Sequence, residues 1–172
     1  LRDGSTNIID VPVSSPKQGY LLIKSLYSLV SSGTEKTLVD FGKANFIDKA
    51  KQQPDKVKDV LNKIKNDGLN STYEAIISKL DKPIPLGYCN VGIVEELGEG
   101  VDEFKVGDLV VSNGSHAEFV TVPKNLCALL PNSVLPKYGT FVPLASIGLQ
   151  GLRLLKPELG ETILVSGLGL IG

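Results

Sequence analysis

The sequence contains no methionine, no tryptophan, one histidine and only two cysteines among its 172 residues. Cys89 and Cys127 have neither CxxC spacing nor the cysteine density of a small secreted framework, which indicates reduced thiols in a cytoplasmic protein. A chain of this length can bury about 70% of the surface that its unfolded form exposes, so it needs no disulfide bridges. Because methionine is missing even at position 1, we expect the sequence to begin inside a longer polypeptide.

A strong charge of one sign is also missing, since 18 basic and 19 acidic residues leave a formal net charge of −1. This balance argues against binding to nucleic acid or to an anionic membrane surface. The apolar runs are short and interrupted by charged residues, so no segment reaches the length of a transmembrane helix. We therefore expect a small-molecule substrate as the partner, and neither a nucleic acid nor a membrane.

The C-terminal eleven residues combine a short apolar run with a pattern of glycines. Thr162–Val165 is β-branched and apolar, as is typical of a buried parallel strand. It leads into Gly167-x-Gly169-x-x-Gly172. The first glycine permits a tight turn, the second lets the backbone approach a pyrophosphate, and the third lets a following helix pack closely on the strand. These three glycines are the predicted cofactor-binding residues. Since the sequence stops at the third, we expect these residues alone to bind a dinucleotide only weakly.

The rest of the chain alternates between β-rich and helical patterns. Four strands are expected between turn sequences typical of a barrel or sandwich, at residues 20–30, 87–97, 109–112 and 117–122. Short helical patterns predict a helix at 34–41 that ends before Gly42, and a largely buried helix or helix pair at 138–155. Residues 44–82 predict two amphipathic helices, the second of which begins with the capping box Ser71-Thr-Tyr-Glu74.

Several phrases occur in the order and spacing of one known superfamily. They are Gly92-Ile-Val94, Leu97-Gly98, Val101, Phe104-Lys-Val-Gly-Asp-Leu-Val110 and Ala117-Glu-Phe-Val120. Together with the terminal glycines they resemble the medium-chain dehydrogenase/reductase superfamily, to which zinc alcohol dehydrogenases belong. The resemblance implies a mainly β chain with α: a GroES-like β-barrel catalytic domain at 1–135, with a helical insertion at about 44–82. Residues 136–172 would then form a connecting helix and the start of a nucleotide-binding Rossmann domain, including its first strand.

The helical insertion and the phrase Ser31-Ser-Gly-Thr-Glu35 resemble a zinc-lacking branch found in surface-polysaccharide gene contexts, sometimes fused to a second oxidoreductase domain. The resemblance implies an NAD- or NADP-dependent oxidoreductase that interconverts an alcohol and a carbonyl on a sugar, a nucleotide-sugar or another small polar substrate. Members of the superfamily commonly form homodimers through the nucleotide-binding domain. The alternative is a noncatalytic GroES-like binding or assembly module that retains a degenerate nucleotide site.

The metal positions of the superfamily are replaced in this sequence. The first zinc-binding cysteine corresponds to Ser32, the Gly-His-Glu phrase reads Gly87-Tyr88-Cys89, and the third ligand falls near Ser146. A short connection, Asn113-Gly-Ser115, stands where the four-cysteine structural lobe would be. Zinc requires three or four suitable ligands in a tetrahedral array, which Cys89 and the lone His116 cannot supply. We predict that the protein holds no zinc.

Thr34 and Tyr88 are the catalytic candidates that the resemblance implies. Thr34 matches the Ser or Thr that passes the substrate proton outward in zinc members, and its alternative role is to cap the helix that begins near it. Tyr88 could protonate a carbonyl during hydride addition, or its ring could simply fill the space of the missing metal. His116 invites a catalytic role as the lone histidine, or is a turn or edge residue. We interpret Cys89 as a small buried hydrophobe, because no base can be assigned to it.

Overall fold

A computed structural model describes residues 5–44 and 83–172 of the chain. The helical insertion expected at 44–82 therefore lies outside the described residues, apart from Ala44. The chain divides into two compact units, one with Leu1–Asp10 and Ser32–Ile84, the other with Val11–Ser31 and Pro85–Gly172. No helix in the described ranges is both long and apolar enough to cross a membrane.

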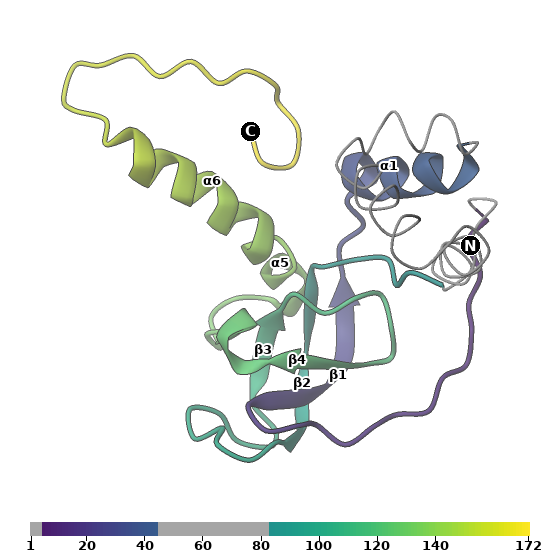
Figure 1. Cartoon of the computed structure of the whole chain (residues 1–172). Coiled ribbons are helices and arrows are strands. Elements are labelled where there is room, and N and C mark those ends of the chain that lie inside the picture. The colour runs from purple at the N-terminus through teal and green to yellow at the C-terminus, as the bar shows by residue number, and fades with distance from the viewer. Residues whose placement is uncertain (1–4, 45–82) are drawn as a thin grey trace, which may run out of the picture. The chain divides into compact units, whose positions relative to one another are not determined.

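The first unit contains helix α1, Ser32–Lys43 (Figure 1). Within it, Thr37 Oγ1 donates a hydrogen bond to the carbonyl oxygen of Gly33 at 2.9 Å. An acidic residue in the first turn and a basic residue in the last complement the helix dipole. The helix begins two residues before the expected start and includes Gly42, so the expected C-terminal glycine stop is wrong. Thr34 lies inside the first turn and does not have the capping position.

The second unit is built on an antiparallel sheet of five strands, in the spatial order β4-β1-β2-β3-β5. Strands β1 to β4 are labelled in Figure 1. Its strands are β1 (Tyr20–Ser28), β2 (Asn90–Leu97), β3 (Leu109–Ser112), β4 (Phe119–Pro123) and β5 (Cys127–Leu129). The four expected strands are confirmed, and β5 is an addition. The sheet is not closed within the part of the chain that the structure describes, because β4 and β5 form its two edges.

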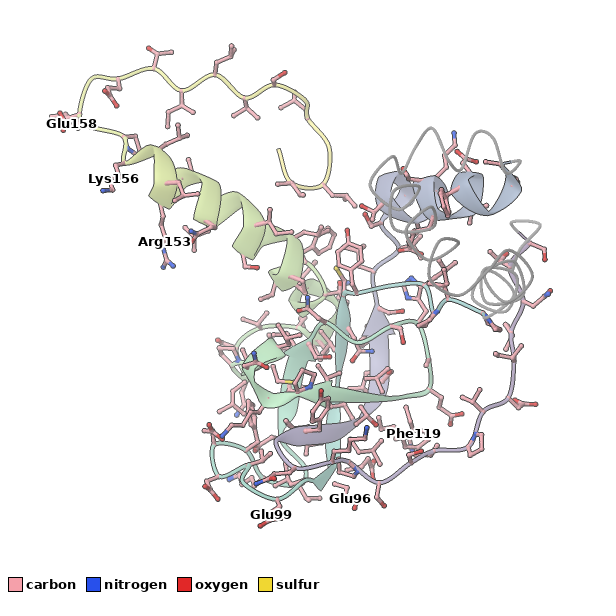
Figure 2. All side chains as sticks on the ribbon, in the orientation of Figure 1. Glu96, Glu99, Phe119, Arg153, Lys156 and Glu158 are labelled. Atoms are coloured by element: carbon pink, nitrogen blue, oxygen red, sulfur yellow. The ribbon has the colours of Figure 1, made fainter. Side chains whose placement is uncertain are left out.

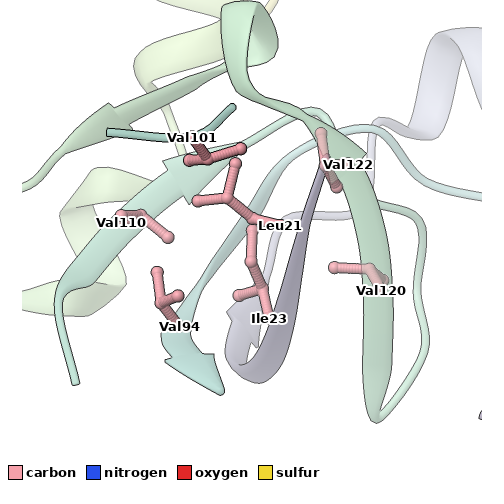
Figure 3. Packing of buried hydrophobic residues seen from close by; sticks show 7 residues of the cluster. All are labelled: Leu21, Ile23, Val94, Val101, Val110, Val120 and Val122. Atoms are coloured by element: carbon pink, nitrogen blue, oxygen red, sulfur yellow. The ribbon is translucent and has the colours of Figure 1, made fainter. Parts of the chain in front are cut away.

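The core of the sheet is made of β-branched and leucine side chains that alternate along the strands. On β1, Leu21 pairs with Val122 and Ile23 pairs with Val120, so one face of the strand meets β4 with apolar side chains. The cluster is completed from β2, β3 and the following turns, and its buried members are Leu21, Ile23, Val94, Val101, Val110, Val120 and Val122 (Figure 3). Apolar pairs across neighbouring strands are the unit that stabilises such a sheet.

Two helices follow the sheet, α5 (Pro136–Gly139) and α6 (Val142–Leu155). They confirm the expected helix pair, but the expectation that it is largely buried is wrong. α5 contacts β1 and β2 whereas α6 contacts β3, and the buried residues of α6 are Pro143 and Leu144 near its start. The apolar side chains farther along are exposed, and Arg153, Lys156 and Glu158 lie at its far end (Figure 2). Apolar patterning alone therefore did not reveal how little of α6 the sheet covers.

The apolar run Thr162–Val165 does not form the expected strand. A parallel strand is stable only beside hydrogen-bonded partners, and the described residues place no strand next to it. Its side chains are accordingly exposed, with Leu164 at 92%. The prediction of a buried strand is wrong for this chain.

Candidate functional site

Tyr88 lies two residues before β2, between a glycine with a positive φ and a buried residue. Gly87 has a φ of +89°, a backbone conformation that residues with a Cβ rarely adopt. Cys89 is fully buried, and its carbonyl oxygen accepts a hydrogen bond from the backbone N–H of Leu29 at 3.0 Å. Tyr88 itself is half-buried. The backbone of Tyr88 therefore lies between a glycine with a defined positive φ and a buried, hydrogen-bonded cysteine. The interpretation of Cys89 as a buried residue is confirmed.

His116 lies directly against this segment, although 28 residues of chain separate it from Tyr88. Its backbone N–H donates a hydrogen bond to the carbonyl oxygen of Leu86 at 2.7 Å, and its Nδ1 lies 2.9 Å from Ser28 Oγ. A Cβ built on Gly87 would be 2.7 Å from each of the His116 atoms Cγ, Cδ2 and Cε1. Equal distances to three ring atoms mean that the Gly87 backbone faces the plane of the imidazole. The ring occupies space that only a glycine leaves open.

A buried polar network holds the connection that carries His116. Asn90 is fully buried on β2, and its Nδ2 donates to Ser25 Oγ of β1 at 2.7 Å. Ser112 of β3 donates from Oγ to Asn90 Oδ1 at 3.4 Å and accepts from the Gly114 N–H at 3.2 Å. The far side of the connection is fixed by Ser25, whose N–H donates to the carbonyl oxygen of Glu118 at 2.8 Å. Because buried hydrogen bonds that are satisfied rigidify their surroundings, His116 sits on a preorganised segment.

Sequence reasoning did not find this arrangement. Asn90 and Ser112 are polar residues in apolar strands, where a side chain that faces solvent is the ordinary expectation. The contact of His116 with Gly87 depends on how residues 113–118 fold back onto residues 86–87, for which the sequence carries no local signal. A usable signal existed in Gly87 itself, since a glycine before a strand often marks a close approach of another group.

The other catalytic candidate, Thr34, is exposed in the first turn of α1. It belongs to the first compact unit, whereas Tyr88 and His116 belong to the second. Its catalytic role stays a prediction.

Within residues 5–44 and 83–172, no three His, Cys, Asp or Glu side chains converge to form a set of metal ligands. Cys89, which stands in the phrase that supplies zinc ligands in the superfamily, is enclosed at the start of β2 with its carbonyl bonded to Leu29. That the protein holds no zinc stays a prediction.

The structure brings the first and third glycines of the terminal pattern together. Gly167 has a φ of +95°, and a Cβ on Gly172 would collide with the carbonyl oxygen of Gly167. Gly169 has open space around its Cα, and a Cβ on Gly148 of α6 would lie 3.3 Å from the carbonyl oxygen of Ile171. A positive φ and a close backbone contact are what a glycine-only turn requires. These residues fit a backbone that approaches a dinucleotide, while the binding itself stays a prediction.

Among the described residues, a thiol and a carboxyl have displaced pKa values. Burial raises the pKa of the Cys127 thiol to about 11. A hydrogen bond from Lys124 Nζ, 2.8 Å from Glu103 Oε1, is the main cause that lowers the pKa of the exposed Glu103 carboxyl.

Comparison with known proteins shows that the chain is similar to oxidoreductases of the alcohol dehydrogenase kind. Residues 56–132 match the family described as the alcohol dehydrogenase GroES-like domain. The chain is 29% identical over 117 residues to (R,R)-butanediol dehydrogenase of Bacillus subtilis, a match that covers 52% of this chain and 34% of that protein. It is 33% identical over 75 residues to a mitochondrial NAD(P)H oxidoreductase of Dictyostelium discoideum, covering 40% of this chain and 21% of that one.

Among solved structures, the quinone oxidoreductase of Coxiella burnetii superposes with a TM-score of 0.60 at 20% identity, covering 90% of this chain and 42% of that one. At this identity the likeness concerns the fold alone. The match spans about a third of the butanediol dehydrogenase and about a fifth of the mitochondrial oxidoreductase.

Proposed function

We propose that the protein is an NAD(P)-dependent, zinc-independent oxidoreductase of the medium-chain dehydrogenase/reductase type that interconverts an alcohol and a carbonyl. The match to the GroES-like domain and the similarity to the Bacillus dehydrogenase support this proposal. In this proposal residues 1–135 form the catalytic domain, and residues 136–172 begin the nucleotide-binding domain. The observation that carries the proposal is Tyr88, a half-buried phenol that follows the Gly87 backbone covered by the His116 ring. By the resemblance, this position corresponds to a metal ligand of the superfamily.

The cofactor assignment is supported by the terminal glycines and by one relative. The positive φ of Gly167 and the tight contact of Gly172 suit a turn whose backbone N–H groups approach a pyrophosphate, with the open Gly169 between them. The Dictyostelium relative is an NAD(P)H oxidoreductase by name. When bound, the nicotinamide supplies or accepts the hydride.

The part of this chain in the reaction is to move a proton and to hold the substrate oxygen. Without a metal to polarise that oxygen, a hydroxyl within hydrogen-bond distance must donate a proton to it as the carbonyl is reduced. We assign that role to Tyr88, and the proton-passing role of Thr34 stays a separate expectation from the resemblance. A small polar substrate suits a hydroxyl donor and accords with the diol named for the Bacillus relative. Sugars and nucleotide-sugars are the substrates that we would screen first.

The cofactor is tested by calorimetric titration of NADH, and then NADPH, into the complete polypeptide that carries this sequence. We expect micromolar binding of one of the two, lost in Gly172→Ala because the new methyl group collides with the Gly167 carbonyl. Gly151→Ala is the matched control, since its methyl group meets open space on α6. If neither nucleotide bound and an independent binding assay agreed, the noncatalytic binding or assembly module would become the better hypothesis.

The proton donor is tested with Tyr88→Phe, assayed with the preferred nucleotide and (R,R)-butanediol, and then with sugars. Loss of a general acid lowers kcat by about 10²- to 10⁴-fold, while a ring that only fills space would leave kcat unchanged. Tyr138→Phe serves as the control, because Tyr138 is an exposed tyrosine on α5.

A further inference from the structure

We propose that His116 is the positioning residue of Tyr88, and that Ser28 fixes the imidazole that does so. This inference rests on the proposed function of Tyr88 as proton donor. His116 acts through the backbone of residues 86 and 87, which lead directly into Tyr88. Three independent contacts carry the inference, and all of them lie within the second compact unit.

The first contact is the packing of the imidazole on Gly87. The ring fills the position that a side chain at residue 87 would take, with three ring atoms 2.7 Å from an ideal Cβ. Glycine adopts a φ of +89° without steric cost but adopts many other conformations as well, so residue 87 does not by itself fix this one. A flat ring resting on this backbone opposes its relaxation, and the direction in which the chain enters Tyr88 is set by that turn.

The second contact is the hydrogen bond from the His116 N–H to the carbonyl oxygen of Leu86, at 2.7 Å. It ties the connection at 113–118 to the residue that precedes the turn. The connection is itself anchored by Ser112 Oγ, which accepts from the Gly114 N–H, and by the Ser25 N–H, which donates to the Glu118 carbonyl. The segment before Tyr88 is thereby linked to two strands, β1 and β3.

The third contact is the 2.9 Å hydrogen bond between His116 Nδ1 and Ser28 Oγ. Ser28 ends β1 and pairs with Asn90 of β2, the strand that begins two residues after Tyr88. The imidazole is thus oriented by Ser28 of β1, and β1 is paired with β2, the strand that follows Tyr88 in the chain. A side chain locked by packing and by a hydrogen bond of its own is what holds a catalytic group within the narrow tolerance that proton transfer needs.

The inference is tested by kinetics on Ser28→Ala, His116→Leu and His116→Asn in the complete polypeptide. An error of about 1 Å in placing a reacting group lowers the rate by about 100-fold, so we expect kcat to fall by about 10- to 100-fold in Ser28→Ala and His116→Leu. KM should change by less than about twofold, because binding of the substrate is not altered. His116→Asn keeps a polar atom near the place of Nδ1 and should recover part of the loss. Asn113→Ala, an exposed neighbour in the same connection, is the control.

A second measurement does not depend on activity. Tyrosine ring signals are recorded by NMR on protein labelled at tyrosine, and the Tyr88 signal is identified by its loss in Tyr88→Phe. We expect Ser28→Ala and His116→Leu to shift or broaden the Tyr88 signal and to leave that of Tyr138 in place. A purely structural role of His116 would instead lower the unfolding midpoint while kcat per folded molecule and the Tyr88 signal stay those of the wild type.

The two proposals fail in different ways. If Tyr88→Phe keeps full activity but the Tyr88 signal responds to His116, the proton donor is wrong and the positioning role stands. If Tyr88→Phe is slow while Ser28→Ala and His116→Leu match Asn113→Ala in kcat and in the NMR spectrum, the positioning role is overturned. Should His116→Leu not fold, Ser28→Ala still decides, because it keeps the ring and removes only its hydrogen bond.

Discussion

The strongest constraint on the candidate site at the scale of single residues is the missing side chain at position 87. Gly87 combines a positive φ with a backbone that the His116 ring covers, so it is required both for its conformation and for the space it leaves. Most glycines in turns satisfy only the first requirement. The two can be separated by experiment because Gly100 also has a positive φ, +75°, but faces open space.

Gly87→Ala is expected to destabilise the protein by about 1–3 kcal/mol from backbone strain, and further because the ring must move. Gly100→Ala should lose only the stability that the strained backbone conformation costs, because its new methyl group meets open space. Both are measured as free energies of unfolding in urea. An equal loss of stability in the two variants would mean that the His116 ring gives way freely, which would weaken the positioning role as well.

Cys127 offers a test of burial through its pKa. Desolvation raises the thiol pKa to about 11, so the folded protein disfavours the reactive thiolate. At pH 8 about one thiol in a thousand is ionised, against about one in four for a free cysteine, and alkylation should be about two orders of magnitude slower than in urea. The Cys89→Ala variant isolates this thiol.

Between pH 7 and pH 9.5 the alkylation rate of Cys127 should rise about tenfold per pH unit without reaching a plateau. By linkage, a raised pKa in the folded state gives a stabilising contribution that is complete below the unfolded pKa and declines as the pH rises towards about 11. A plateau near pH 8.5 would contradict the buried environment.

At the scale of the element, α6 is anchored at one end. Leu144 is 1% exposed and Leu154 is 73% exposed, although both belong to the same apolar helix. Leu144→Ala should therefore cost about 2–5 kcal/mol in unfolding free energy, whereas Leu154→Ala should stay within about 0.5 kcal/mol. Comparable losses in the two variants would show that something covers the far end of the helix in solution.

The elements that could be predicted from the sequence are those with local patterns of sufficient length. The bounds of β3 were predicted at both ends, since Leu109–Ser112 lies between clear turn sequences. β5 was missed because its three residues are too few to show an alternation. Thr162–Val165 has the composition of a strand and does not form one, because composition cannot supply a hydrogen-bonded neighbour.

The candidate site could be predicted only in part, for a similar reason. Tyr88 was found because it replaces one residue in a recognisable phrase. His116 was noticed as the lone histidine, but its contact with Gly87 arises from tertiary folding of a connection 28 residues farther along. Its role was therefore left open between catalysis and a turn.

At the scale of the molecule, we expect the sheet to unfold as one unit, because its larger core cluster takes buried residues from β1, β2, β3 and β4. Ile23 is fully buried in the inner strand β1 and pairs with Val94 on one side and Val120 on the other. Ile23→Ala should cost about 2–5 kcal/mol and lower the urea midpoint of the whole sheet in a single transition with an unchanged slope. Val106→Ala, at an exposed site, is the control. A second transition would mean that the strands unfold separately.

The strand order has a further consequence during synthesis on the ribosome. β1 (Tyr20–Ser28) is made first, yet its partners are Asn90–Leu97 and Phe119–Pro123, so more than about 60 residues must follow before the earlier partner exists. At roughly 5–20 residues per second, the nascent chain carries an unpaired apolar strand for several seconds. That interval is when a chaperone would find this protein, and when slow codons between β1 and β2 would lengthen the exposure.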